Sequence, residues 1–227
     1  MKGWKQIFQA KGQENKAGVA ILISDKIDFQ KRAIKREPEG HFLTLKGRIH
    51  QEDINIVNMY APNIGAPKYI KKILEDFKKD IDSNTIIVGD FYTPLSKMDR
   101  SSKQNINKDI MALKNTLDEM DLTAIYRAFN PKQAKYTLFS NAHGTFSKIE
   151  HMIGHKTSLN KFKKIVIISR IFSDHKELKL ETNPKGTNPK HSKTWRLNSM
   201  LLNNEWIKNE IREDIKNSCK QMKMNSQ

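Results

Sequence analysis

The chain has 227 residues, 37% of them hydrophobic, which suits one globular domain with an appendage or two small domains. Its 41 Lys and Arg against 25 Asp and Glu give a net charge of +16, which fits nucleic-acid binding and an ordinary basic protein about equally. The single cysteine, Cys219, excludes an internal disulfide framework and a cysteine-based zinc site. No segment resembles a signal peptide or reaches the roughly 20 apolar residues that cross a bilayer, so we expect a nuclear or cytoplasmic protein, not secreted and without a membrane partner.

Short apolar runs separated by turn signals predict the first strands. We expect strands over residues 18–24, 41–49 and 54–60, with a charged turn over 35–40 between the first two. The sequence Ala61-Pro62-Asn63 ends the third strand. A helix follows from Pro67, because the next apolar residues recur at helical spacing: Ile70, Ile73, Leu74, Phe77 and Ile81.

The middle of the chain continues this alternation of strands and helices. Residues 85–91 are a continuous apolar run around Gly89-Asp90, which predicts a buried strand with a carboxylate at its C-terminal end. A second helix is expected over 108–120 from the spacing of its apolar residues. The remaining predicted strands cover 136–140, 147–153, 164–171 and 177–181.

The composition changes at Thr182. Residues 182–194 contain two Asn-Pro pairs and a glycine but no apolar residue, which predicts a linker after a domain of residues 1–181. Apolar residues then recur at helical spacing beyond the linker, so residues 195–227 are predicted to form a helical tail.

Four short motifs could carry chemistry, although each is weak alone. Asp90 at a strand end could face a cleft, but Asp after Gly is more often a turn or cap residue. Asp174 and His175 follow a strand and could bind a metal and a phosphate, yet an exposed turn is the commoner role. Tyr60 could present its hydroxyl to a phosphate or simply lie at the edge of the core. Glu150 lies in a strand pattern and could equally face solvent.

The order and spacing of these motifs resemble the endonuclease/exonuclease/phosphatase superfamily, and within it the endonuclease domain of LINE-type (long interspersed element) retrotransposon polyproteins. The similar segments are GWKQIFQAKGQENKAGVAILISDK, VNMYAPNIGAP, VGDFYTPLSKMDRS, YTLFSNAHGTFSKIEH and FSDHKELKLE. The tail, KTWRLNSMLLNNEWIKNEI, is similar to the segment that precedes the reverse transcriptase, so the resemblance covers essentially the whole chain. It implies an α/β sandwich of two mixed sheets packed face to face, with helices outside.

The resemblance also implies roles for particular residues. Family members hydrolyse a phosphodiester of target DNA with Mg²⁺, and the nick primes reverse transcription. By this resemblance Asp90 activates or orients the attacking water, His175 holds the scissile phosphate, Asp174 lies on the metal side and Tyr60 is the active-site tyrosine. DNA is the implied partner, and no small-molecule cofactor is expected. The residues matched to DNA contacts are Arg100, Thr137 and the loop over 141–146.

Three departures from the family pattern predict a loss of activity. The family domain begins with one strand carrying a catalytic asparagine and a second carrying a metal-binding glutamate, whereas only Met1-Lys2-Gly3 precede Trp4 here, so we expect two N-terminal strands to be missing from the fold. Tyr92 replaces the asparagine of the Gly-Asp-Phe-Asn pattern. Glu150 replaces the aspartate that supports the catalytic histidine and is one methylene longer.

These departures make Mg²⁺ binding doubtful and predict a truncated, inactive endonuclease-like domain. Two alternatives stay open from the sequence. One is an active phosphodiesterase of the same superfamily, completed by a segment encoded upstream. The other is a non-catalytic basic nucleic-acid-binding module.

Overall fold

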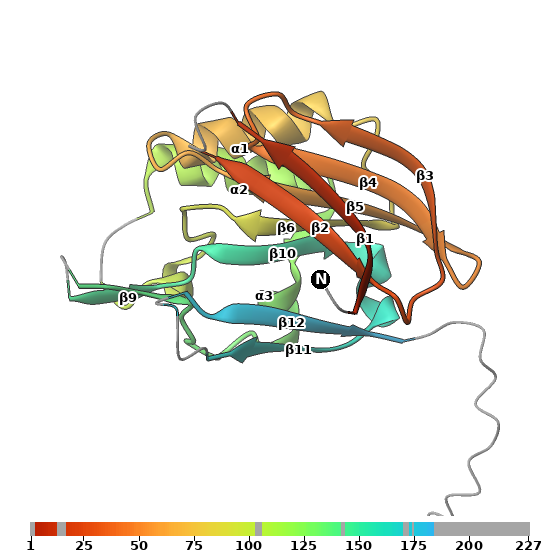
Figure 1. Ribbon diagram of the computed structural model, residues 1–227. Coiled ribbons are helices and arrows are strands. Elements are labelled where there is room, and N and C mark those ends of the chain that lie inside the picture. The colour runs from red at the N-terminus through yellow and green to blue at the C-terminus, as the bar shows by residue number, and fades with distance from the viewer. Residues whose placement is uncertain are drawn as a thin grey trace, which may run out of the picture. The chain divides into compact units, whose positions relative to one another are not determined.

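The centre of the protein is a six-stranded mixed sheet (Figure 1). The computed structural model describes residues 3–12, 17–102, 106–141, 144–169, 173 and 175–183. The strand order is β3-β4-β5-β6-β10-β7, in which β5 and β6 are parallel and the other neighbours antiparallel. The strands are β3 (Phe29–Arg36), β4 (Phe42–Ile49), β5 (Glu52–Tyr60), β6 (Thr85–Asp90), β10 (Glu150–His155) and β7 (Leu122–Ala124).

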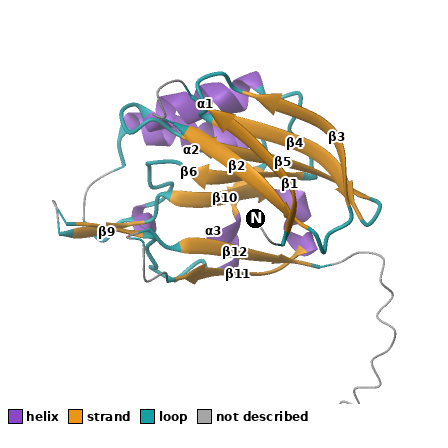
Figure 2. Cartoon of the chain, in the orientation of Figure 1, coloured by secondary structure: helices purple, strands orange, loops and turns teal. Residues whose placement is uncertain are grey.

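Two helices, α1 (Ala66–Asp76) and α2 (Lys108–Glu119), cover one face of this sheet (Figure 2). Side chains alternate between the two faces of a strand, so every second residue of β5 points toward the helices. Val57 and Met59 are buried there against Ile70 and Leu113 of the helices. This apolar layer fixes the register of β5 and, with it, the position of the strand's last residue.

The opposite face carries two separate β-hairpins. One pairs β1 (Trp4–Lys11) with β2 (Gly18–Ser24) and packs over the side of the sheet that β4 forms. The other pairs β11 (Phe162–Ile168) with β12 (Glu177–Thr182) and packs, together with α3 (Ile125–Phe129), over the side that β10 forms. The described chain is therefore a sheet between helices on one side and two hairpins on the other.

A third, shorter hairpin projects from the domain (Figure 1). It pairs β8 (Leu138–Ser140) with β9 (Thr145–Ser147). The rings of Phe139 and Phe146 lie across the pair with centroids 4.5 Å apart, and both remain exposed. The two short 3-10 turns, η2 (Lys97–Asp99) and η3 (Lys156–Lys161), complete the described elements.

The predicted α/β sandwich is confirmed, and several segments differ from the prediction. The charged segment expected to be a turn over 35–40 is partly strand, because β3 runs to Arg36. The single strand expected over 147–153 is two, since β9 ends at Ser147 and β10 begins at Glu150. Four elements were not expected at all: the strands β1, β3 and β7 and the short helix α3.

Most of the predicted linker and the whole helical tail lie outside the described residues, and the two missing strands stay a prediction. Within the described part of the chain, no helix is long and apolar enough to span a membrane.

Candidate active site

Three neighbouring strands of the central sheet bring three of the predicted site residues side by side. Tyr60, the last residue of β5, is the register partner of Asp90 at the end of the parallel strand β6. Asp90 is in turn the partner of Glu150, the first residue of the antiparallel strand β10. All three side chains are half-buried. Residues 90 positions apart in sequence therefore share one end of the sheet because of strand order and register.

His175, just before β12, joins this group. Its Nδ1 is hydrogen-bonded to Oε1 of Glu150. Asp90, Glu150 and His175 each offer one ligand atom, and these three atoms lie within 4.8 Å of one another. Two carboxylates and an imidazole form a donor set that suits a divalent cation. The buried Oε2 of Glu150 has no hydrogen-bond partner among the described residues, so this oxygen could serve as a ligand.

The contact between Glu150 and His175 bears on one of the three departures from the family pattern. The longer side chain of Glu150 was expected to misplace its support of the histidine. The hydrogen bond is nevertheless formed. A carboxylate on Nδ1 fixes the orientation of an imidazole ring.

Burial sets the electrostatics of Asp90. It raises the pKa of the Asp90 carboxyl, and the nearby Glu150 carboxylate raises it further. The backbone N–H of Tyr92 donates to Oδ1 of Asp90 at 3.0 Å, which opposes this rise by stabilising the charged form. A bound cation would favour the charged form in the same way.

Tyr92 occupies the position where the family pattern has an asparagine. Its hydroxyl lies 3.5 Å from that of Tyr60, and the two rings meet edge to face with centroids 5.7 Å apart. This contact and burial raise the pKa of Tyr92 to about 12, so the phenol stays neutral. The backbone of Tyr92 is left-handed, with φ of 45°, a conformation that asparagine adopts far more readily than an aromatic residue.

Gly89 allows the end of β6 to lie close to the neighbouring strand β5. Its φ is 142°, and a Cβ placed on it would lie 1.8 Å from the carbonyl oxygen of Met59 on the parallel neighbour β5. Any side chain at this position would force the two strands apart. The glycine before Asp90 is therefore required by the close approach of two backbones.

The remaining predicted residues have different outcomes. Asp174 lies outside the described residues. Arg100 is half-buried and forms an isolated bridge with Ser147 at the base of the projecting hairpin. Thr137 is fully buried, and its Oγ1 accepts a hydrogen bond from the backbone N–H of Ile149 at 3.1 Å. The hydroxyl of Thr137 therefore faces the protein interior, and the DNA contact expected of this residue stays a prediction.

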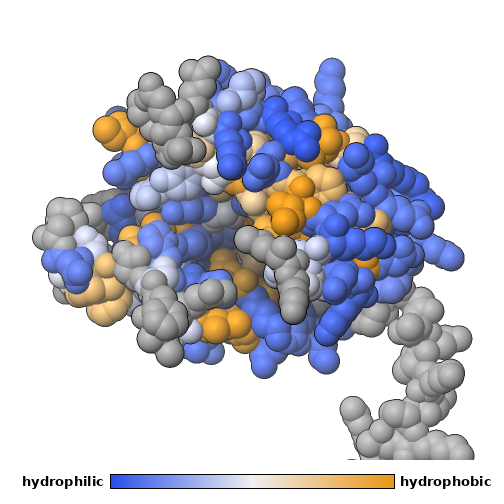
Figure 3. Space-filling view, viewed as in Figure 1, coloured by the Kyte–Doolittle hydropathy of each residue, from blue (hydrophilic) through white to orange (hydrophobic). Residues whose placement is uncertain are grey.

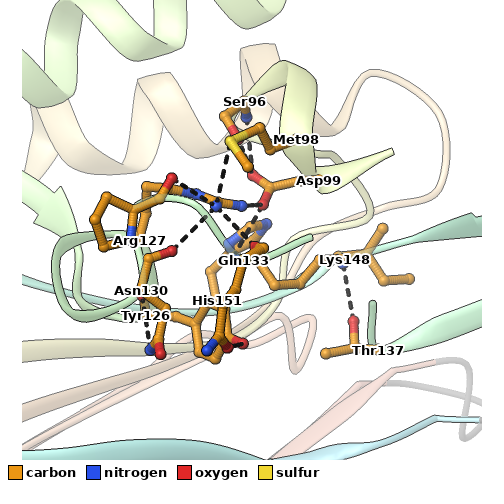
Figure 4. Close-up of polar contacts among 12 residues, drawn as sticks. Ser96, Met98, Asp99, Tyr126, Arg127, Asn130, Gln133, Thr137, Lys148 and His151 are labelled. Atoms are coloured by element: carbon orange, nitrogen blue, oxygen red, sulfur yellow. Dashed lines mark hydrogen bonds and ion pairs between the residues drawn. The ribbon is translucent and has the colours of Figure 1, made fainter. Parts of the chain in front are cut away.

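Sequence reasoning missed a buried network of charged side chains beside the site (Figure 4). Oδ1 of Asp99 lies 2.7 Å from Arg127 and 3.1 Å from the Nζ of Lys148. The ring of His151 is buried close by, and its Nε2 lies 3.0 Å from the carbonyl oxygen of Thr93. The one sequence signal for this network is that Lys148 and His151 lie within two residues of the candidate site residue Glu150.

Comparisons with known proteins agree on the fold. No family model matches the chain. The endonuclease domain of TRAS1, a telomere-specific non-LTR retrotransposon, superposes with a TM-score of 0.62 at 14% identity over 79% of this chain and 80% of that one. The catalytic domain of APE2 from Xenopus laevis gives 0.62 at 14% identity, over 82% and 79%. An AP endonuclease from Archaeoglobus fulgidus gives 0.60 at 17% identity, over 80% of each chain.

The chain has the fold of the endonuclease/exonuclease/phosphatase superfamily. In sequence it is 25% identical over 201 residues to the "Transposon TX1 uncharacterized 149 kDa protein" of Xenopus laevis, a match that covers 86% of this chain and 15% of that protein. The resemblance to a retrotransposon endonuclease domain of this superfamily is thus confirmed by a transposon protein in sequence and by TRAS1 in fold.

Proposed function

We propose that the chain is the endonuclease-like domain of a retrotransposon-type polyprotein, that it binds DNA and Mg²⁺, and that the 227-residue chain does not itself nick DNA. The observation that carries the proposal is the convergence of Asp90, Glu150 and His175 beside Tyr60. TRAS1 and the AP endonucleases, which share the fold, are named for cleaving nucleic acid, and this supports the choice of substrate.

The chemistry expected of these residues is phosphodiester hydrolysis. Asp90 and Glu150, together with Asp174, would hold the cation, which would offset the negative charge of the phosphate. Glu150 orients the His175 ring, which can then donate to a phosphate oxygen. Asp90 in its charged form can orient or deprotonate a water, and the raised pKa of its carboxyl makes it a better base once ionised.

One feature of the site supports the absence of nicking. The Tyr92 ring stands where the family pattern has an amide, and its hydroxyl is turned to Tyr60. Loss of one preorganised polar group from such a site typically costs on the order of a hundred- to a thousandfold in rate.

The DNA part of the proposal is supported by the net charge of +16. Hydrophilic residues also cover most of the face seen in Figure 3. The same charge supports a second candidate, a non-catalytic basic nucleic-acid-binding module. The two candidates differ at the Asp90 cluster, because only the endonuclease-like domain requires a cation there.

Calorimetric titration with Mn²⁺, a close substitute for Mg²⁺, tests this difference. We expect the wild type to bind Mn²⁺ and Asp90→Asn to bind it at least about tenfold more weakly, since a charged ligand is lost. Asp118→Asn is the matched control, because Asp118 is an exposed carboxylate paired with Lys156 away from the cluster. Equal binding by all three proteins would favour the basic binding module.

Relaxation of supercoiled plasmid in Mg²⁺ tests the absence of nicking. We expect the wild type and the Asp90→Ala, His175→Ala double variant to be indistinguishable. Nicking by the wild type that the double variant loses would show that the site is complete and the inactivity proposal wrong.

A further inference from the structure

Thr137 joins the two segments that carry Glu150 and His175. Its Oγ1 accepts a hydrogen bond from the backbone N–H of Ile149, the residue before Glu150, at 3.1 Å. Its carbonyl oxygen accepts from the backbone N–H of Lys176, the residue after His175, at 2.8 Å. Its own N–H donates to the carbonyl of Ser147 at 2.9 Å. One buried threonine is thus bonded to the backbone next to both members of the hydrogen-bonded pair.

The segment that Thr137 contacts is held from its other side by the buried charged network (Figure 4). The backbone N–H of Lys148 donates to the carbonyl of Asp99 at 2.7 Å, and its Nζ pairs with the carboxylate of the same residue at 3.1 Å. Oδ2 of Asp99 accepts from both the N–H and the hydroxyl of Ser96, each at 2.9 Å. Residues 147–149 are therefore fixed by the backbone of the loop after β6 and by Thr137.

The two supports differ in what they reach. The charged network holds the loop over 96–99 and residues 147–149. Thr137 also reaches the segment that carries His175, through Lys176 and through the bridge between its neighbour Leu138 and His175. The N–H of Ile149 belongs to the Lys148–Ile149 peptide, directly before Glu150. A rotation of this peptide would tilt the start of β10 and shift the long Glu150 side chain, so the hydroxyl bond to Ile149 helps to set where that carboxylate lies.

We propose that Thr137 is a positioning residue for the Glu150–His175 pair, acting through the Ile149 and Lys176 amides; the consequence for metal binding rests on the proposed function. Groups that orient a metal-binding side chain typically change affinity by about 10- to 100-fold when removed. Only the hydroxyl differs between Thr and Val of the same shape, whereas Ser retains it.

The test compares Thr137→Val with Thr137→Ser. Thr116→Val is the matched control, because Thr116 is also buried and its hydroxyl donates to the Ala112 carbonyl within α2, away from the site. Calorimetry should show Mn²⁺ binding about tenfold weaker for Thr137→Val, restored to within about twofold by Thr137→Ser and unchanged in Thr116→Val. Wild-type affinity in Thr137→Val would overturn the proposal.

Two NMR measurements separate this proposal from the proposed function, because neither requires a metal. The ¹⁵N signals of the His175 ring report its bond to Glu150, and we expect them to move in Thr137→Val but not in Thr137→Ser. If wild type binds no Mn²⁺ yet these signals move as stated, the positioning role stands and the proposed metal site fails. Should Thr137→Val not fold, hydrogen exchange of wild type decides: a rapidly exchanging Ile149 amide would refute the bond to Thr137, and a protected one supports it.

Discussion

Replacing Lys148 with Met should destabilise the protein far more than removing an exposed lysine. The side chains of Lys148 and Asp99 are 1% and 2% exposed and lie 3.1 Å apart, and Nζ also lies 4.5 Å from the centroid of the Tyr126 ring. The Lys148–Asp99 contact is a buried ion pair, and removing one partner of such a pair typically costs about 3–5 kcal/mol. A desolvated cation–π contact contributes about 2 kcal/mol.

Part of this gain is offset by the cost of burying the ammonium, which also lowers the pKa of Lys148. Asp99 retains its bond to Arg127 in the variant, so its charge is not left alone. We therefore expect Lys148→Met to lose about 3 kcal/mol of unfolding free energy, at the low end of the range for breaking a buried pair from one side.

Urea unfolding, monitored by circular dichroism, measures this loss as a lower urea concentration at the midpoint, with the dependence of the unfolding free energy on urea unchanged. Lys156→Met is the control, because it removes an exposed pair with Asp118, 3.2 Å apart, that contributes about 0–1 kcal/mol. If Lys148→Met were no less stable than Lys156→Met, the cost of desolvating the Lys148 ammonium would equal its attraction to Asp99 and the Tyr126 ring. The network would then not stabilise the site region.

Three further predictions follow from the charge, the buried histidine and the strained tyrosine. Burial lowers the pKa of His151 from 6.5 to about 4, so the folded state binds fewer protons than the unfolded chain between these values. Urea unfolding should therefore show stability falling as the pH drops from 6.5 to 4, by up to about 3 kcal/mol, and His151→Gln should lack this dependence. Binding to duplex DNA of arbitrary sequence, measured by fluorescence anisotropy, should weaken more than about tenfold between roughly 50 and 200 mM salt, and a flat dependence would contradict nucleic-acid binding. Tyr92→Asn should stabilise the chain by about 1 kcal/mol by relieving the left-handed backbone, whereas Tyr92→Phe should not, and equal midpoints for the two would refute the strain argument.

The sequence was sufficient for elements whose burial follows a simple period. The strand β6 and the helix α1 could be predicted because apolar residues recur in them at the positions that the structure buries, continuously in β6 and at helical spacing in α1. Strand β3 was missed for the opposite reason. It lies at the edge of the sheet, only Phe29 is buried, and most of its other side chains are charged or polar. Charges on an edge strand hinder pairing with another chain, but they also hide the strand from pattern analysis.

The candidate site could be assembled from sequence only through the family resemblance. Tyr60, Asp90 and Glu150 meet because of strand order and register, which no single strand encodes. Lys148 and Asp99 were not recognised, because charged residues are rarely buried and each is stabilised by a partner far along the chain. The inward position of Thr137 likewise depends on residues 147–149.

The backbone contact at Gly89 changes how its motif should be interpreted in related sequences. Because a side chain there would collide with Met59, a copy that had ceased to cut DNA would still need the glycine in order to fold. Asp90 is under no such steric requirement, since its side chain lies at the half-buried end of the sheet. Among decaying copies of such an element, loss of the aspartate with the glycine retained would mark proteins maintained for their shape after the selection for cleavage had ended.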